Sequence, residues 1–133
     1  MKYEAILALH NESNPNTGLS IQGSVEELTG LENVKSNNKA PTFTWDEVLA
    51  KEKELQAEYP MQLLRVERDG KLRVEVDPKT CEAYNNGTQL SNEWKNYRQA
   101  LLDMTLQTPT LDENGNLKAG LELDEIYWPT KPE

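Results

Sequence analysis

Residues 63–76, LLRVERDGKLRVEV, decide the fold because their pattern fits two different structures. Apolar and charged residues alternate on both sides of Asp69-Gly70, a pair that commonly turns a β-hairpin. A three-residue loop, Arg68–Gly70, would pair Val66 with Leu72 and keep the two apolar sets on one face of the hairpin. We therefore favour a hairpin here, and the alternative is a helix interrupted by Gly70.

The segment after this stretch predicts an amphipathic helix from Ser91 to Met104. Ser91 is a favoured N-cap residue, because its hydroxyl can accept a hydrogen bond from a free amide of the first turn. Large apolar side chains recur at helical spacing along the segment, namely Trp94, Tyr97, Leu101 and Met104. Regular patterning ends after Met104. We expect residues 105–133 to form an extended arm with at most a short hairpin about Asn114-Gly115.

A second, charged helix is expected upstream of residues 63–76. Thr44 and Glu47 stand in the arrangement of a capping box, which predicts that the helix begins at Thr44. Pro60 has no backbone donor and its ring collides with the preceding turn, so this helix should end or bend near Tyr59.

Residues 1–35 predict a small antiparallel meander. An imperfect period of two indicates a strand over Tyr3 to Leu9, and Leu19 to Ile21 resumes the alternation after a run of turn-forming residues. A third short strand is expected among Val25 to Leu28 or Leu31 to Val34. The predicted fold class is therefore α+β, with a meander, a linker, a helix/hairpin/helix region and an extended arm over residues 1–35, 36–43, 44–104 and 105–133.

Composition limits the classes of function open to this chain. It has 133 residues and a formal net charge of -9 at pH 7. This acidic balance repels phosphate backbones and anionic lipid headgroups, so we expect neither a nucleic acid nor a membrane partner. No run of residues approaches the roughly 18 apolar residues of a membrane helix, and the first residues do not resemble a secretory signal. A cytoplasmic protein is the expectation.

The sequence predicts no metal, no cofactor and no catalytic site. Cys81 is the one cysteine and His10 the one histidine, so an intrachain disulfide and a zinc cluster are both excluded. The run from Asp112 to Asn116 resembles the start of a calcium loop, but Leu117 stands where that loop needs glycine. A single histidine also leaves no evident base for a serine or cysteine nucleophile.

Partner binding is the function that the aromatic residues favour. Trp94, Tyr97 and the pair Tyr127-Trp128 are large rigid side chains of the kind that anchor protein interfaces. The alternative is that these rings hold the arm against the chain's own helix. The candidate partner-binding residues are Trp94, Tyr97, Arg98, Leu101, Asp103, Tyr127, Trp128 and Pro129.

The C-terminal sequence resembles that of bacteriophage tail assembly chaperone-like proteins. The motifs are WKNYRQALLD at residues 94–103, QTPTL at 107–111 and WPTKP at 128–132. Residues 63–72 and the run TWDE at 44–47 are similar to upstream parts of the same family. The chain departs from the family pattern at Gly70 and at Asp77-Pro78, and its tail after Met104 is longer than usual.

This resemblance implies a non-catalytic phage protein. Its expected partner is a tail, tail-fibre or baseplate protein, with self-association as a further expectation, and its expected place of action is the host cytoplasm during assembly. One alternative is a permanent structural subunit of the virion tail, fibre or baseplate. Another is a phage hydrolase or lysis factor, which the missing acid/base constellation disfavours.

Overall fold

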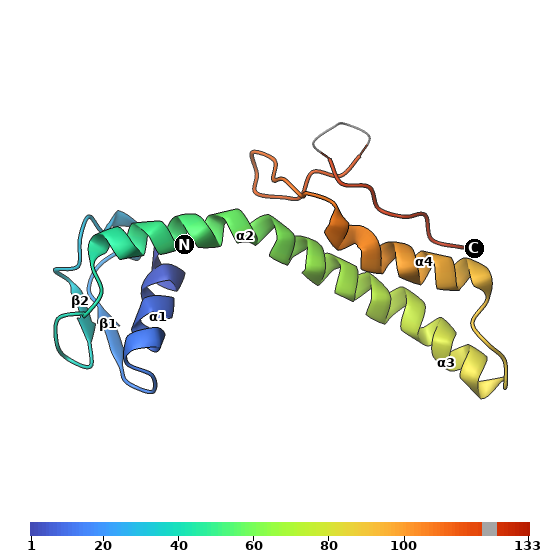
Figure 1. Ribbon diagram of the computed structural model, residues 1–133, viewed down its shortest axis with the longest axis horizontal. Coiled ribbons are helices and arrows are strands. Elements are labelled where there is room, and N and C mark those ends of the chain that lie inside the picture. The colour runs from blue at the N-terminus through green and yellow to red at the C-terminus, as the bar shows by residue number, and fades with distance from the viewer. Residues whose placement is uncertain (121–124) are drawn as a thin grey trace. The chain divides into compact units, whose positions relative to one another are not determined.

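The computed structural model describes residues 1–120 and 125–133 and shows an α+β chain (Figure 1). The chain divides into two compact units, Met1–Glu58 and Tyr59–Glu133. The boundary between them falls inside helix α2 (Trp45–Lys71), next to Pro60. Each unit has its own apolar clusters, so we describe the units separately.

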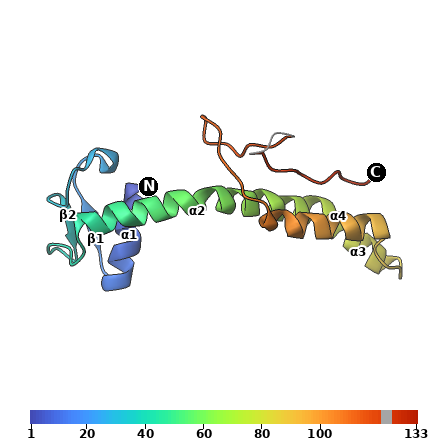
Figure 2. The same cartoon turned by 45° about the horizontal axis from the view of Figure 1, so that its top comes forward.

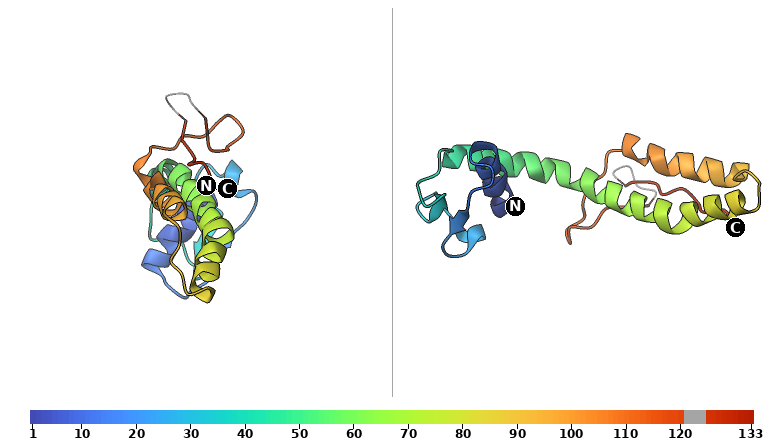
Figure 3. Two further views of the ribbon diagram at one scale, coloured as in Figure 1. Left: turned by 90° about the vertical axis from the view of Figure 1, so that its right-hand side faces the viewer. Right: turned by 90° about the horizontal axis from the view of Figure 1, so that it is seen from below.

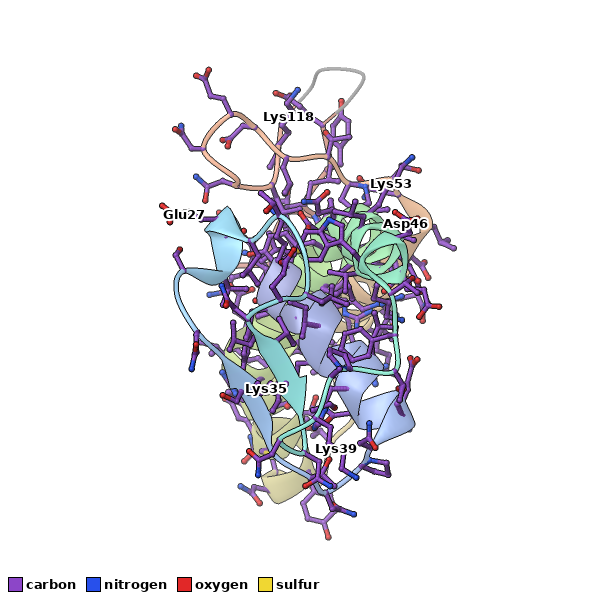
Figure 4. All side chains as sticks on the ribbon, turned by 90° about the vertical axis from the view of Figure 1, so that its left-hand side faces the viewer. Glu27, Lys35, Lys39, Asp46, Lys53 and Lys118 are labelled. Carbon is purple, nitrogen blue, oxygen red and sulfur yellow. The ribbon has the colours of Figure 1, made fainter. Side chains whose placement is uncertain are left out.

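The N-terminal unit packs one helix against a two-stranded sheet (Figure 4). Its elements before α2 are α1 (Lys2–Ser13), β1 (Leu19–Ile21), the 3-10 helix η1 (Val25–Glu27) and β2 (Val34–Ser36). The two strands are antiparallel, with Leu19 opposite Ser36 and Ile21 opposite Val34. Phe43, just before α2, and Val48, near the start of that helix, complete the buried cluster.

The strand predicted over Tyr3 to Leu9 is wrong, because these residues belong to α1. The buried residues are Ala5, Ile6 and His10, which recur at a helical spacing and not at a period of two. Ile6 is fully buried, although the alternation places it on the face opposite to Tyr3 and Ala5. The predicted meander is therefore a helix followed by a two-stranded sheet, and β2 begins at Val34, the last residue of the second stretch proposed for a third strand.

A buried polar network ties α1 to the sheet. The His10 ring is 1% exposed, its Nε2 donates to the Thr17 carbonyl oxygen at 3.0 Å, and its Nδ1 contacts the Ser36 hydroxyl. Asn14 also donates to that hydroxyl, at 3.3 Å. Ser36 stands at the start of the segment predicted to be a linker, yet it is a buried residue of β2 because its hydroxyl satisfies His10.

Residues 45–85 form an unbroken run of helical structure. Thr44 caps it as predicted, since the Glu47 amide donates to the Thr44 hydroxyl at 3.2 Å. The helix does not end near Tyr59, because α2 continues through Pro60 to Lys71. It is followed by a π-helical segment, η2 (Leu72–Val76), and by α3 (Asp77–Asn85).

The predicted hairpin over residues 63–76 is wrong, because the segment is helical. The helix is also not interrupted at Gly70, as the alternative expected, since α2 continues through it to Lys71. Leu64, Leu72 and Val76 lie about two turns and one turn apart in the helix, and all three lie in apolar clusters of the C-terminal unit. Val66 and Val74, which complete the apparent alternation, are 71% and 68% exposed. Helical burial of three apolar residues thus prevails over the turn preference of Asp69-Gly70.

The π-helical segment explains how the run passes Pro78. The Asp77 amide donates to the Leu72 carbonyl oxygen, five residues back, so the turn just before the proline is wider than an α-helical turn. Proline cannot donate a hydrogen bond and its ring crowds the preceding turn. A locally wider turn accommodates both properties without ending the helix.

The second predicted helix is confirmed as α4 (Asn92–Leu102), followed by the 3-10 helix η3 (Asp103–Leu106). Ser91 caps it by accepting the Trp94 amide at 3.5 Å. Figures 2 and 3 show α4 running beside η2 and α3, with the C-terminal arm returning along it. The short hairpin about Asn114-Gly115 is also present, because Leu111 and Leu117 form an antiparallel bridge.

Candidate partner-binding surface

Three of the eight candidate residues are buried in the core of the C-terminal unit. Trp94, Tyr97 and Leu101 are 7%, 4% and 0% exposed, and they form one cluster with Val76 of η2. The two rings meet edge to face with their centroids 5.8 Å apart. The helical face that carries them is therefore used to pack α4 on the long helical run.

The hydroxyl of Tyr97 is satisfied within this cluster. It donates to a carboxylate oxygen of Glu75, which η2 places opposite it. Burial of the phenol and then the bond and negative charge of Glu75 raise the pKa of Tyr97 far above its usual value of about 10. Tyr97 is consequently a neutral, fixed residue of the packing interface at physiological pH.

Trp128 connects the arm to both clusters of the C-terminal unit. It is half-buried and packs against the cluster of Trp94 and Tyr97 as well as against a second cluster, which consists of Leu64, Met104 and Ile126. The Lys71 ammonium lies 5.2 Å from the centre of its ring, a cation–π distance. The aromatic arm thus docks on its own unit through Ile126 and Trp128.

A side-chain clasp holds the arm at Tyr127. The amide group of Gln107 donates to the Tyr127 carbonyl oxygen at 3.0 Å and accepts the Tyr127 backbone amide at 2.7 Å. One glutamine side chain therefore satisfies both backbone groups, as a neighbouring strand would. The clasp leaves the Tyr127 side chain 53% exposed.

Four candidate residues line one hollow in the surface of this unit. They are Asp103 of η3 and Tyr127, Trp128 and Pro129 of the arm. The hollow, which we call the arm hollow, has a volume of about 430 Å³ and is completed by Ala100, Met104, Gln107 and Thr130. No local pattern in the sequence points to Gln107 in this place, because only the returning arm brings Tyr127 to it.

The last candidate, Arg98, is exposed on α4. Within residues 1–120 and 125–133, no hydrogen bond or ion pair engages its guanidinium group. Asp103 accepts a hydrogen bond from Gln99 at 2.9 Å, so one of its oxygens is held on α4. Among the described residues, Asp103 is the one charged side chain that lines the arm hollow.

The calcium-like run from Asp112 to Asn116 is a turn. Asp112 Oδ1 accepts the backbone amides of Asn114 and Asn116 at 2.8 and 2.9 Å, as an aspartate that closes a turn commonly does. In the described part of the chain, no three acidic, histidine or cysteine side chains gather as a metal site would require. None of the helices described combines the length and apolar character that crossing a bilayer requires.

Comparison with known proteins adds one finding to this geometry. A family model described as phage tail assembly chaperone protein matches residues 61–133, which is more than half of the chain and covers the arm hollow. No curated protein and no solved structure matches the chain.

Proposed function

The chain belongs to the phage tail assembly chaperone family, which is non-catalytic, and we propose that it binds a tail, tail-fibre or baseplate protein through the arm hollow. The observation that carries the proposal is the half-exposed Tyr127 ring above a hollow of about 430 Å³. A rigid aromatic side chain beside an open hollow suits a protein interface, because it adds contact area at little cost in side-chain entropy.

The composition of the hollow indicates the chemistry of the segment bound. Met104, Trp128 and Pro129 offer apolar surface, while Asp103 supplies a negative charge at one side. The whole chain carries a net charge of -9, which attracts cationic partners at long range. The proposed ligand is therefore an apolar side chain next to a lysine or arginine on a tail component.

The buried candidates take a supporting part in this proposal. Trp94, Tyr97 and Leu101 pack α4 against the long helical run, and Trp128 packs the arm against the same unit. They therefore support the elements whose residues line the hollow. Arg98 of α4 and Asp103 of η3 are exposed charged residues and are available for contact with a partner. A modest, partly polar surface of this kind suits a chaperone that must release its client in the host cytoplasm.

Site-specific photocrosslinking in infected cells tests the proposal. A benzoylphenylalanine side chain in place of Tyr127 should crosslink to a tail, fibre or baseplate protein of the same phage. The matched control replaces Tyr84 of α3, which is 84% exposed and is not one of the residues that line the arm hollow. Equal crosslinking at both positions, or none to a tail component at Tyr127, would contradict the proposal.

Mass spectrometry of purified virions separates the chaperone from the alternative, a permanent structural subunit. A chaperone that leaves after assembly should be absent from mature particles while crosslinking to their components during infection. Stoichiometric presence in the particles would favour the structural subunit, and the arm hollow would then be a permanent contact.

A further inference from the structure

One face of the helical run in the C-terminal unit is apolar and uncovered. Val66 and Val74 are 71% and 68% exposed, and Gly70 lies midway between them at intervals of one turn. The opposite side of the same run carries Leu64 and Val76, which are fully buried. We call the surface of Val66, Gly70 and Val74 the valine face.

Gly70 is not required by the unit's own packing. A Cβ atom built on it meets nothing within 4 Å, and its backbone lies in the helix outside the positive-φ region. A glycine in a helix interior costs about 1 kcal/mol relative to alanine, so its presence calls for a reason outside the monomer. Close approach of another helix at this point is one that fits, because glycine lets two backbones meet.

Charge reverses along the chain at Gly70. Glu67 and Asp69 precede it, and Lys71 and Arg73 follow it. Glu67 and Arg73 are exposed and make no ion pair within the part of the chain that is described. Asp69 is held by Arg68 at 2.7 Å but is 61% exposed, and the Lys71 ammonium lies near the Trp128 ring.

The change of charge sign at Gly70 favours a second copy of this helix as the partner, in an antiparallel orientation. In an antiparallel pair of these helices centred on Gly70, residues on the same flank meet, so Asp69 faces Arg73 of the other copy and Glu67 faces Lys71. Both symmetry-related sets are then of opposite sign. In a parallel pair, Glu67 would face Asp69 and Lys71 would face Arg73, which places like charges together.

We propose that two copies of this chain pair antiparallel through their valine faces and cross at Gly70. The two-fold axis places Val66 of each copy beside Val74 of the other. A hollow of about 400 Å³, lined in part by Leu63, Val66 and Glu67, adjoins this face and can receive a side chain of the second copy. The proposal concerns self-association and does not depend on the identity of any tail client.

Charge-reversed variants of the full chain test the direction as well as the contact. Asp69→Arg alone places a second positive charge opposite Arg73 of the other copy, and Arg73→Asp alone places two negative charges together. Each variant should weaken self-association at least about tenfold, because two attractive pairs become repulsive by symmetry. In an equimolar mixture of the two single variants, both contacts of a mixed pair join opposite charges, so mixed pairs should form about as well as native pairs. The double variant Asp69→Arg/Arg73→Asp restores both attractive contacts within one chain and should also associate as the native chain does.

Sedimentation equilibrium of each variant measures these constants, with circular dichroism to verify helix content. The controls, Asp46→Arg and Lys53→Asp, change the net charge equally at exposed sites of the N-terminal unit (Figure 4) and should leave association unchanged. A native chain that stays monomeric at high concentration overturns the proposal and leaves the valine face to a client protein. So does a double variant that remains as weak as the two single variants.

Discussion

Trp94 is a central packing residue of the C-terminal unit. Its ring is 7% exposed, contacts the Tyr97 ring edge to face, and lies 5.7 Å from the Lys79 ammonium. The ring fills the space between α4 and the long helical run, so its loss leaves a large cavity.

Replacing Trp94 by alanine should lower the free energy of unfolding of the C-terminal unit by about 3–5 kcal/mol. Urea unfolding followed by circular dichroism measures this change. Tyr84→Ala is the matched control, because that ring is 84% exposed and its removal should cost less than about 0.5 kcal/mol. Equal losses in the two variants would show that Trp94 does not serve the core.

Tyr97 predicts a dependence of stability on alkaline pH. Its pKa is raised in the folded chain, first by burial and then by Glu75, so the folded state holds the phenol proton more tightly than the unfolded state does. The resulting stabilisation is fully present below the unfolded pKa of about 10 and is lost as pH rises from there toward the higher folded pKa.

The measurement is the difference in unfolding free energy between the native chain and Tyr97→Phe. At pH 8 the native chain should be more stable by about 1 kcal/mol, because the phenylalanine cannot donate to Glu75. Between about pH 10 and 11 this advantage should shrink by about 1 kcal/mol. A constant difference across this range would mean that Tyr97 titrates alike in both states.

At the residue scale, the spacing of apolar residues predicted which side chains are buried, but not which parts of the chain cover them. The helical recurrence of Trp94, Tyr97 and Leu101 correctly indicated one apolar face. What covers that face is not contained in the local pattern, because Val76 and Trp128 come from 18 residues before and 34 residues after Trp94. The same pattern serves a partner's pocket or the chain's own core.

At the scale of elements, residues 63–76 show why a local pattern can mislead. The alternating pattern of a hairpin would place Val66 and Val74 on the buried face. The helix instead leaves both valines exposed and buries Leu64 and Val76. The choice is made by α4, whose apolar face offers burial at helical intervals. The free energy gained by packing against a neighbouring helix cannot be predicted from the apolar pattern of one segment alone.

The clasp between Gln107 and Tyr127 predicts how firmly the arm is held. Gln107→Leu removes both hydrogen bonds, so the Tyr127 amide should exchange with solvent at least about fivefold faster, the equivalent of about 1 kcal/mol. Gln107→Glu keeps an acceptor for that amide but loses the donor to the carbonyl, and its rate should be intermediate. Hydrogen exchange measured by NMR gives these rates, and unchanged exchange in Gln107→Leu would mean that Ile126 and Trp128 suffice to hold the arm.

At the scale of the whole molecule, the apolar clusters follow the two compact units. The cluster of Ala5, Ile6 and Val34 draws only on residues before Glu58, and the clusters of Trp94 and Leu64 draw only on residues after it. Helix α2 contributes to both units, and Pro60 near the boundary removes one of its internal hydrogen bonds. The helix is therefore weakest where the two units divide it.

This division predicts that a cavity in one unit weakens that unit first. Ile6→Ala removes a fully buried side chain and should cost about 2–5 kcal/mol, with faster hydrogen exchange in α1, β1 and β2 while α4 keeps its protection. Trp94→Ala should produce the opposite distribution, with faster exchange in α4 and η2. Peptide-resolved hydrogen exchange with mass spectrometry distinguishes the two patterns. If either variant deprotected both units alike, the chain would unfold as one cooperative body, and the continuity of α2 through Pro60 would outweigh the separation of the clusters.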